Sequence, residues 1–262
     1  MIPEVSIATI NDIARAAGRA ILEVYHHADF SQVVDFKADR SPLTLADRAS
    51  HEVIAPALQE HYPNIPLISE EGADVDYVTR REWEYFWLVD PLDGTKEFIK
   101  RNGQFTVNIA LIHQHRPVLG VIYTPVTEEL YFATQAGYAS DVEAGGHKQI
   151  PGGAVETLRV RRSPEKRVAV RSSSHASEEE DAVLKKYQVT ESIARGSSLK
   201  FCMVAEGKAD IYYRHGPTME WDTAAGQAIV EAAGGKMFQE TSDRPFTYNK
   251  ESLRNGSFLV VT

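Results

Sequence analysis

Two aspartates three residues apart follow an apolar run in the segment 87–95. The apolar run predicts a buried strand that ends at Asp90, and the proline after it starts a turn that brings Asp93 to the same side. Gly94 allows a ligand to approach the backbone closely, and Thr95 opens a short predicted helix whose free amides suit a phosphate. Two carboxylates beside free amides are suited to Mg²⁺ together with phosphate. The same residues also fit a turn without a ligand, because Asp-Pro and Asp-Gly are common turn dipeptides.

Two further acidic side chains stand where predicted elements begin or end. Glu70 follows a short apolar strand predicted over 66–69, and Asp222 stands at the start of a helix predicted over 222–233. Carboxylates at the ends of strands and helices can converge on one cleft. The alternatives are a solvated loop for Glu70 and a helix N-cap for Asp222.

A fourth acidic position lies early in the chain. Asp47 falls in the first turn of a helix predicted over 45–61. A carboxylate there stabilises a helix because it faces the positive end of the helix dipole. It can also serve as a base that orients and deprotonates a water molecule at a metal site. Both interpretations stay open at this point.

The first part of the chain predicts helices followed by an antiparallel sheet. Apolar residues at a spacing of three and four predict the helices 7–24 and 45–61. Strands joined by short turns predict an antiparallel meander. Its members are 66–69, 86–89, 107–112, 118–123 and 130–134. The glycine-containing segment 140–153 predicts an exposed loop.

Beyond about residue 155 the pattern changes to alternating strands and helices. The predicted strands are 168–170, 192–194, 209–213 and 258–261, and the predicted helices are 177–187, 198–205 and 222–233. Alternation of this kind is typical of an α/β unit. We therefore expect two lobes, an N-terminal α+β lobe over 1–155 that carries the metal site and a C-terminal α/β lobe over 156–262 that recognises the substrate.

Composition and charge exclude several classes of protein. Of the 262 residues, 43% are hydrophobic and 25% are charged, which is typical of a folded globular protein rather than a disordered or fibrous one. The net charge of −9 argues against binding polymeric nucleic acid, which requires a basic face. The sole cysteine, Cys202, excludes an internal disulfide framework. We expect a cytoplasmic protein with no secretory signal and no transmembrane segment, and leave open both peripheral membrane association and a homodimer.

Four segments, in their order along the chain, resemble the inositol monophosphatase superfamily. They are Asp-x-Ser-Pro-x-Thr-x-Ala-Asp at 39–47, Glu-Glu at 70–71, Asp-Pro-Leu-Asp-Gly-Thr at 90–95 and Trp-Asp-x-Ala-Ala-Gly at 221–226. The resemblance implies a layered α-β-α-β-α sugar-phosphatase fold, with an antiparallel-sheet lobe and a mixed-sheet lobe. It also implies hydrolysis of phosphate monoesters with two or three Mg²⁺ ions, and inhibition by Li⁺.

The resemblance also assigns roles to individual residues. It implies metal ligation by Glu70, Asp90, the Leu92 carbonyl, Asp93 and Asp222. It implies that Asp47 acts with Thr95 to activate the attacking water, with Thr44 in support. The substrate contacts that it implies are Gly94, Thr95, His175, Ser197, Lys200, Arg214 and Asp222.

Within the superfamily, the second half of the chain resembles the bacterial 3′(2′),5′-bisphosphate nucleotidases of the CysQ type. The stretches that carry this resemblance are 173–175, 196–202, 205–212 and 216–226. It implies adenosine 3′,5′-bisphosphate as the small-molecule substrate and a place in sulfur metabolism. The alternative is the same chemistry on inositol phosphates or another small phosphate ester. A catalytically inert nucleotide-binding module is disfavoured, because such a module needs neither Asp47 nor Thr95.

Overall fold

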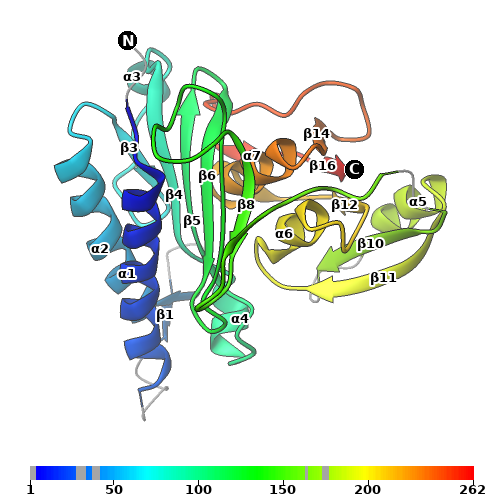
Figure 1. Ribbon diagram of the computed structural model, residues 1–262, viewed down its shortest axis with the longest axis horizontal. Helices are drawn as coiled ribbons and strands as arrows, with labels where there is room; N and C mark the ends of the chain where they lie inside the picture. Colours follow the sequence, from blue (N-terminus) through cyan, green and yellow to red (C-terminus); the bar gives the residue numbers. More distant parts are fainter. Residues whose placement is uncertain (1–3, 28–33, 37–41, 163–164, 173–176) are drawn as a thin grey trace.

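Helices and sheets alternate in layers in the computed structural model, which describes residues 4–27, 34–36, 42–162, 165–172 and 177–262. Helices α1 and α2 cover one face of a large sheet, α6 and α7 lie between that sheet and a second one, and α5 lies on the far side of the second sheet (Figure 1). The predicted α-β-α-β-α fold is confirmed. Within the described ranges, none of the helices combines the length and the apolar character that a membrane span needs.

The first sheet has seven strands in the order β3-β4-β5-β6-β7-β8-β9. Only β3 and β4 run parallel, and the other neighbours are antiparallel. The predicted antiparallel meander is therefore correct from β4 to β7, but it is wrong for the strand over 66–69, which runs parallel to its neighbour. The bounds are β3 Leu67–Ser69, β4 Tyr85–Asp93, β5 Thr106–His113, β6 Arg116–Thr124, β7 Glu129–Thr134, β8 Gly145–Gln149 and β9 Val155–Thr157.

The central strands of this sheet are largely apolar because both of their faces are covered. On β5, Val107, Ile109 and Leu111 pack in the cluster that includes α1 and α2. The alternating residues Ala110 and Ile112 pack in the cluster that includes α6 and α7. Successive side chains of a strand point to opposite faces, so a strand buried on both sides needs a continuous apolar run.

The second sheet has five strands in the order β11-β10-β12-β16-β14. It is mixed, because β10 runs parallel to β11 and β12 while β16 runs antiparallel to β12 and β14. The bounds are β10 Arg167–Ser172, β11 Val189–Arg195, β12 Ile211–Arg214, β14 Lys236–Gln239 and β16 Phe258–Val261. The remaining strands form two short antiparallel pairs. They are β1 Val34–Phe36 with β2 Pro42–Thr44, and β13 Thr218–Met219 with β15 Arg254–Asn255.

The helices agree with the apolar periodicity of the sequence. Their bounds are α1 Ile7–Tyr25, α2 Leu45–His61, α3 Tyr77–Arg80, α4 Thr95–Ile99, α5 Glu178–Lys186, α6 Leu199–Ala205 and α7 Ala224–Ala232. A 3₁₀ turn over Glu220–Asp222 precedes α7, so the prediction that this helix starts at Asp222 is wrong by two residues. The turn matters for the site below because it sets the direction in which the Asp222 side chain points.

The prediction of an exposed loop over 140–153 is wrong, because Gly145–Gln149 forms strand β8 on the first sheet. Gly146 lies against α7, where a Cβ atom would stand 3.3 Å from the Ile229 carbonyl oxygen. The glycine therefore permits close packing of a helix on a strand rather than a turn. His147 stacks on Phe132 of β7, with 5.2 Å between ring centroids.

The first sheet ends with β9 at Thr157, and the second begins with β10 at Arg167. Helix α7 comes from the second half of the chain but packs against β5, β6, β7 and β8 of the first sheet. The division into lobes at residue 155 stays a prediction. The contact does show that the acidic turn before α7 is carried on the first sheet, beside the ends of its strands.

A substitution at Gly120 on β6 tests how closely α7 approaches the first sheet. A Cβ atom there would lie 2.7 Å from the Ala225 carbonyl oxygen and 2.8 Å from the Ala228 Cβ. We expect Gly120→Ala to lower the free energy of unfolding by about 1–3 kcal/mol, because the helix must shift. Urea denaturation measures this, with Gly256→Ala as the control, since nothing lies within 4 Å of a Cβ at that position. Equal stability of the two variants would contradict the packing.

Candidate active site

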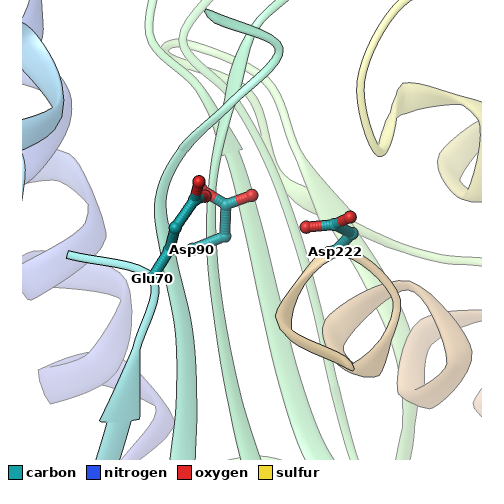
Figure 2. Close-up of side chains that lie close together, drawn as sticks. All are labelled: Glu70, Asp90 and Asp222. Atoms are coloured by element: carbon teal, nitrogen blue, oxygen red, sulfur yellow. The ribbon is translucent and has the colours of Figure 1, made fainter. Parts of the chain in front are cut away.

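Three carboxylates converge at one edge of the first sheet. Strands β3 and β4 are parallel neighbours with Ser69 opposite Val89, so Glu70 and Asp90 leave the sheet at the same edge. Asp222 reaches the same space from the 3₁₀ turn before α7. One carboxylate oxygen from each of the three lies within 4.8 Å of the others, and Figure 2 shows the side chains facing one another.

Burial makes this cluster electrostatically costly. Burial raises the pKa of Asp90 well above its ordinary value, and the neighbouring Glu70, Asp93 and Asp222 raise it further. Burial followed by the charge of Asp93 likewise raises the pKa of Asp222. Buried like charges repel strongly, so the ionised cluster requires a cation. Hard carboxylate oxygens at this spacing fit Mg²⁺.

The Asp222 carboxylate is free to face the cluster because it does not cap α7. Its Oδ2 accepts a hydrogen bond of 2.8 Å from the amide of Met219, three residues earlier. The N-cap of α7 is Thr223, whose side chain makes no capping hydrogen bond. The interpretation of Asp222 as the N-cap of this helix is therefore wrong.

Asp93 lies in the same cavity but is held differently from the other three. Its Oδ2 accepts hydrogen bonds from the hydroxyls of Ser197 at 2.8 Å and Ser198 at 2.7 Å. Within the described residues, it is not part of the group whose ligand atoms lie within 4.8 Å of one another. Its predicted role as a metal ligand stays a prediction, as does that of the Leu92 carbonyl.

A cavity of about 260 Å³ contains most of the predicted site residues. The ones that line it are Glu70, Asp90, Leu92, Asp93, Gly94, Thr95, Ser197, Lys200, Arg214 and Asp222. A second cavity of about 250 Å³ shares Ser172, Tyr212 and Arg214 with it. His175 lies outside the described residues.

Asp47 lies behind Thr95, which lines the cavity. The amide and hydroxyl of Thr44 both donate to Asp47 Oδ2, at 2.8 and 2.5 Å, in a capping box at the start of α2. Its other oxygen, Oδ1, lies 3.5 Å from the Thr95 hydroxyl. Burial raises the pKa of Asp47 to about 6, and the charges of Glu71 and Glu70 contribute to the rise. The capping role and the position of a base are thus compatible in one side chain.

Cationic side chains also line the cavity. Lys200 is buried rather than exposed on its helix, and its ammonium donates to the Ser197 carbonyl at 2.6 Å and lies over the Tyr212 ring. Burial lowers the pKa of Lys200 to about 8. Arg214, at the end of β12, has a buried Nε with no hydrogen-bond partner in the described part of the chain. The cavity therefore combines carboxylates that suit a cation with hydrogen-bond donors that suit an anion.

A partly buried ion pair, which was not predicted from the sequence, holds the Asp222 turn. Glu220 is fully buried, and its Oε1 accepts a hydrogen bond of 2.5 Å from the Lys250 ammonium. Lys250 also donates to Asn255, whose amide nitrogen donates to the Thr223 hydroxyl at 3.2 Å. These residues fix the backbone on both sides of Asp222. No local pattern signals the pair, since its members are thirty residues apart.

Comparison with known proteins agrees with this arrangement. A family model described as "Inositol monophosphatase family" matches residues 3–258. The chain belongs to this family.

Relatives named 3′(2′),5′-bisphosphate nucleotidase CysQ resemble this family member along nearly its whole length. The protein of that name from Escherichia coli O157:H7 is 47% identical over 95% of this chain and 96% of its own. The one from Salmonella typhimurium is 46% identical over the same shares of the two chains.

The family fold is also seen in solved structures. The crystal structure of CysQ from Bacteroides thetaiotaomicron has a TM-score of 0.82 and 42% identity, and the match covers 97% of each chain. The inositol monophosphatase from Anabaena has a TM-score of 0.75 and 24% identity, covering 97% of this chain and 89% of its own. At 24% identity the likeness concerns the fold alone.

The raised pKa of Asp47 predicts how the stability of the metal-free protein changes with pH. The contribution of a carboxyl whose pKa rises on folding is fully present below its unfolded pKa, ordinarily 3.8, and is lost as the pH rises through about 6. Relative to Asp47→Asn, the wild type should therefore lose up to about 3 kcal/mol of unfolding free energy between about pH 4 and about pH 7.5. Urea denaturation in excess chelator measures the difference, and parallel pH profiles for the two proteins would contradict it.

Proposed function

We propose that the protein is a Mg²⁺-dependent phosphomonoesterase that removes the 3′-phosphate of adenosine 3′,5′-bisphosphate, giving AMP and phosphate. The observation that carries this proposal is a single cavity lined by both carboxylates and cationic side chains. The carboxylates suit divalent cations, while Lys200 and Arg214 suit a second phosphate. The names of the relatives at 46–47% identity support the same substrate class.

The residues that would hold two or three Mg²⁺ ions are Glu70, Asp90, Asp93 and Asp222, with the Leu92 carbonyl. The fit rests on carboxylates that are buried close together, at a cost that a cation would relieve. Bound Mg²⁺ would supply the positive charge that holds the scissile phosphate, acidifies a water molecule and stabilises the leaving oxygen.

We assign Asp47 and Thr95 to the removal of a proton from the attacking water. Thr44 occupies Oδ2 of Asp47, so Oδ1 is the oxygen that faces Thr95. A carboxylate with a pKa of about 6 is a suitable base near neutral pH. We assign Thr95 to orient the water and to pass its proton to Asp47. The water oxygen forms a bond to phosphorus as the bond from phosphorus to the ribose 3′-oxygen breaks. The leaving oxygen takes a proton from solvent water to become the 3′-hydroxyl, and Asp47 returns its proton to solvent.

Substrate orientation falls to the groups around this centre. Gly94 adopts a φ of +92° before the one-turn helix α4, which leaves the first amides of the helix without an intrahelical partner. We assign the Gly94 and Thr95 amides to the scissile phosphate, and Lys200 and Arg214 to the 5′-phosphate. The Ser197 backbone lines the same cavity beside Lys200.

Loss of the base should slow the reaction without unfolding the protein. We expect Asp47→Asn to lower kcat about 10²–10⁴-fold, because a general base contributes a factor of that order. Asparagine keeps an oxygen that can accept from Thr44, so the helix start is retained. Phosphate release at saturating Mg²⁺, with circular dichroism to confirm folding, measures the effect. An unchanged kcat would remove Asp47 from the mechanism.

Removal of one cationic side chain should selectively weaken binding of the bisphosphate. A hydrogen bond to a charged group contributes about 1.5–3 kcal/mol, so Lys200→Met should raise KM for adenosine 3′,5′-bisphosphate roughly 10- to 150-fold. Methionine keeps the apolar packing against Tyr212, and inositol 1-phosphate, which lacks a second phosphate, serves as the control substrate. If the wild type prefers inositol 1-phosphate, the nucleotidase proposal is wrong. If the wild type prefers the bisphosphate but Lys200→Met does not raise KM for it, the assignment of Lys200 is wrong.

A further inference from the structure

A cluster of hydroxyl and amide side chains joins the two sheets at Asp93. Thr106 and Asn108 come from β5 of the first sheet, while Ser197 and Ser198 come from the segment between β11 and α6. All four are buried. Ser197 and Ser198 both donate to the same oxygen of Asp93, Oδ2, at 2.8 and 2.7 Å. The cluster therefore lets the C-terminal half of the chain hold a carboxylate of the N-terminal half.

The available protons fix the direction of these hydrogen bonds. Asn108 Nδ2 donates to Ser198 Oγ at 2.9 Å, so the only proton of Ser198 is left to donate onward. Its nearest acceptor is Asp93 Oδ2 at 2.7 Å, with the Asp222 carbonyl farther away at 3.1 Å. Thr106 lies 2.6 Å from Ser197, but it also donates to the Asn108 side-chain carbonyl oxygen at 2.9 Å, and its one proton cannot serve both contacts. Ser197 is nevertheless the donor to Asp93, because a carboxylate oxygen accepts and the hydroxyl carries the proton of that contact.

This arrangement leaves one oxygen of Asp93 for a cation. Asn108 Nδ2 also approaches Oδ2, at 3.4 Å, so the donors gather on that atom. Within the described residues, the hydrogen bonds to the Asp93 side chain all go to Oδ2. Donors on one carboxylate oxygen fix the rotation of the group, while Oδ1 keeps its lone pairs.

The backbone at Ser197 is held in an uncommon conformation. Ser197 has a φ of +52°, in the left-handed region that a residue with a side chain rarely adopts. Its carbonyl accepts from the Lys200 ammonium at 2.6 Å, which fixes this conformation. A Cβ atom on Gly196 would lie 2.5 Å from the Glu97 Cγ, so the segment passes the first half of the chain at close range. Strained backbone of this kind persists where the surroundings hold it in place.

We propose that Ser197 and Ser198 are positioning residues that fix the Asp93 carboxylate for Mg²⁺ binding. The inference rests on the proposed function, because it requires Asp93 to be a metal ligand. It gives the Ser197 hydroxyl a role through Asp93 rather than a direct contact with substrate, since Asp93 and Thr106 already engage that hydroxyl. Ser198, at 1% exposure, acts only through its neighbours. The metal site is then complete only when the two sheets are correctly apposed.

The test is the Mg²⁺ affinity of the metal-free protein, measured by titration calorimetry. Loss of a group that orients a metal ligand typically weakens binding about 10–100-fold, and we expect this of Ser197→Ala and of Ser198→Ala. The matched control is Thr134→Val, which removes a buried hydroxyl that bonds only to the backbone of Gln135 within the described residues. Ser198→Thr retains the hydroxyl and should restore most of the affinity. Thermal unfolding in chelator establishes that each variant is folded.

The outcomes separate this inference from the proposed function. If Asp93→Asn weakens Mg²⁺ binding but both alanine variants and their double variant bind as the wild type does, the positioning role is overturned. If Asp93→Asn itself binds Mg²⁺ as the wild type does, the metal assignment in the proposed function fails, and the inference with it. A further readout is the Mg²⁺ concentration for half-maximal phosphate release, which should rise in both alanine variants and not in Thr134→Val.

Discussion

Repulsion among buried carboxylates is the constraint on which the rest of the site depends. Glu70, Asp90 and Asp222 bring ligand oxygens within 4.8 Å of one another, and burial raises the pKa of both aspartates. Such a cluster costs folding free energy unless a cation neutralises it. Apolar layers on both faces of the first sheet supply the stability that tolerates this cost. The fold can thus be understood as a rigid frame around an unfavourable arrangement of charge.

The frame is built from segments far apart in the chain. The parallel pair β3 and β4 delivers two of the carboxylates, and the turn before α7 delivers the third. The ion pair of Glu220 and Lys250 holds that turn. Removal of Lys250 would leave the fully buried Glu220 carboxylate unpaired, which is strongly destabilising. The pair therefore links the position of the turn to the stability of the fold. Asp93 is held in turn by hydroxyls from the second half of the chain. Precise placement of a metal site requires such support on each ligand.

Several elements of the fold and of the acidic site could be predicted from the sequence, because the residues that determine them are neighbours along the chain. Asp90 follows an apolar run that could only be a buried strand, and α1 has strict apolar periodicity. The position of Asp47 in a first helical turn was also correct, although its proton chemistry still has to be tested.

The features that sequence reasoning did not reach are tertiary. The burial of Lys200 depends on Tyr212 and on the turn at Ser197, which no helical pattern encodes. Gly146 of β8 looks like a loop glycine in the sequence, because the reason for its small size is the packing of α7 against it. Asp222 bonds to Met219 rather than capping α7, because a 3₁₀ turn intervenes. The hydroxyls on Asp93 have partners about one hundred residues away, beyond any local motif.

The measurement that tests the central claim most directly is the unfolding free energy of Asp90→Asn, in chelator and in saturating Mg²⁺, at about pH 8. Asparagine retains the oxygen that accepts from the Leu92 amide but carries no charge. We expect the variant to be more stable than the wild type in chelator, because the raised pKa of Asp90 costs the folded wild type stability as soon as the pH exceeds the ordinary value of 3.8. In Mg²⁺ the order should reverse, since the wild type alone has the full set of carboxylates to bind the ion. A variant that is less stable than the wild type in chelator, or equally stabilised by Mg²⁺, would contradict the account.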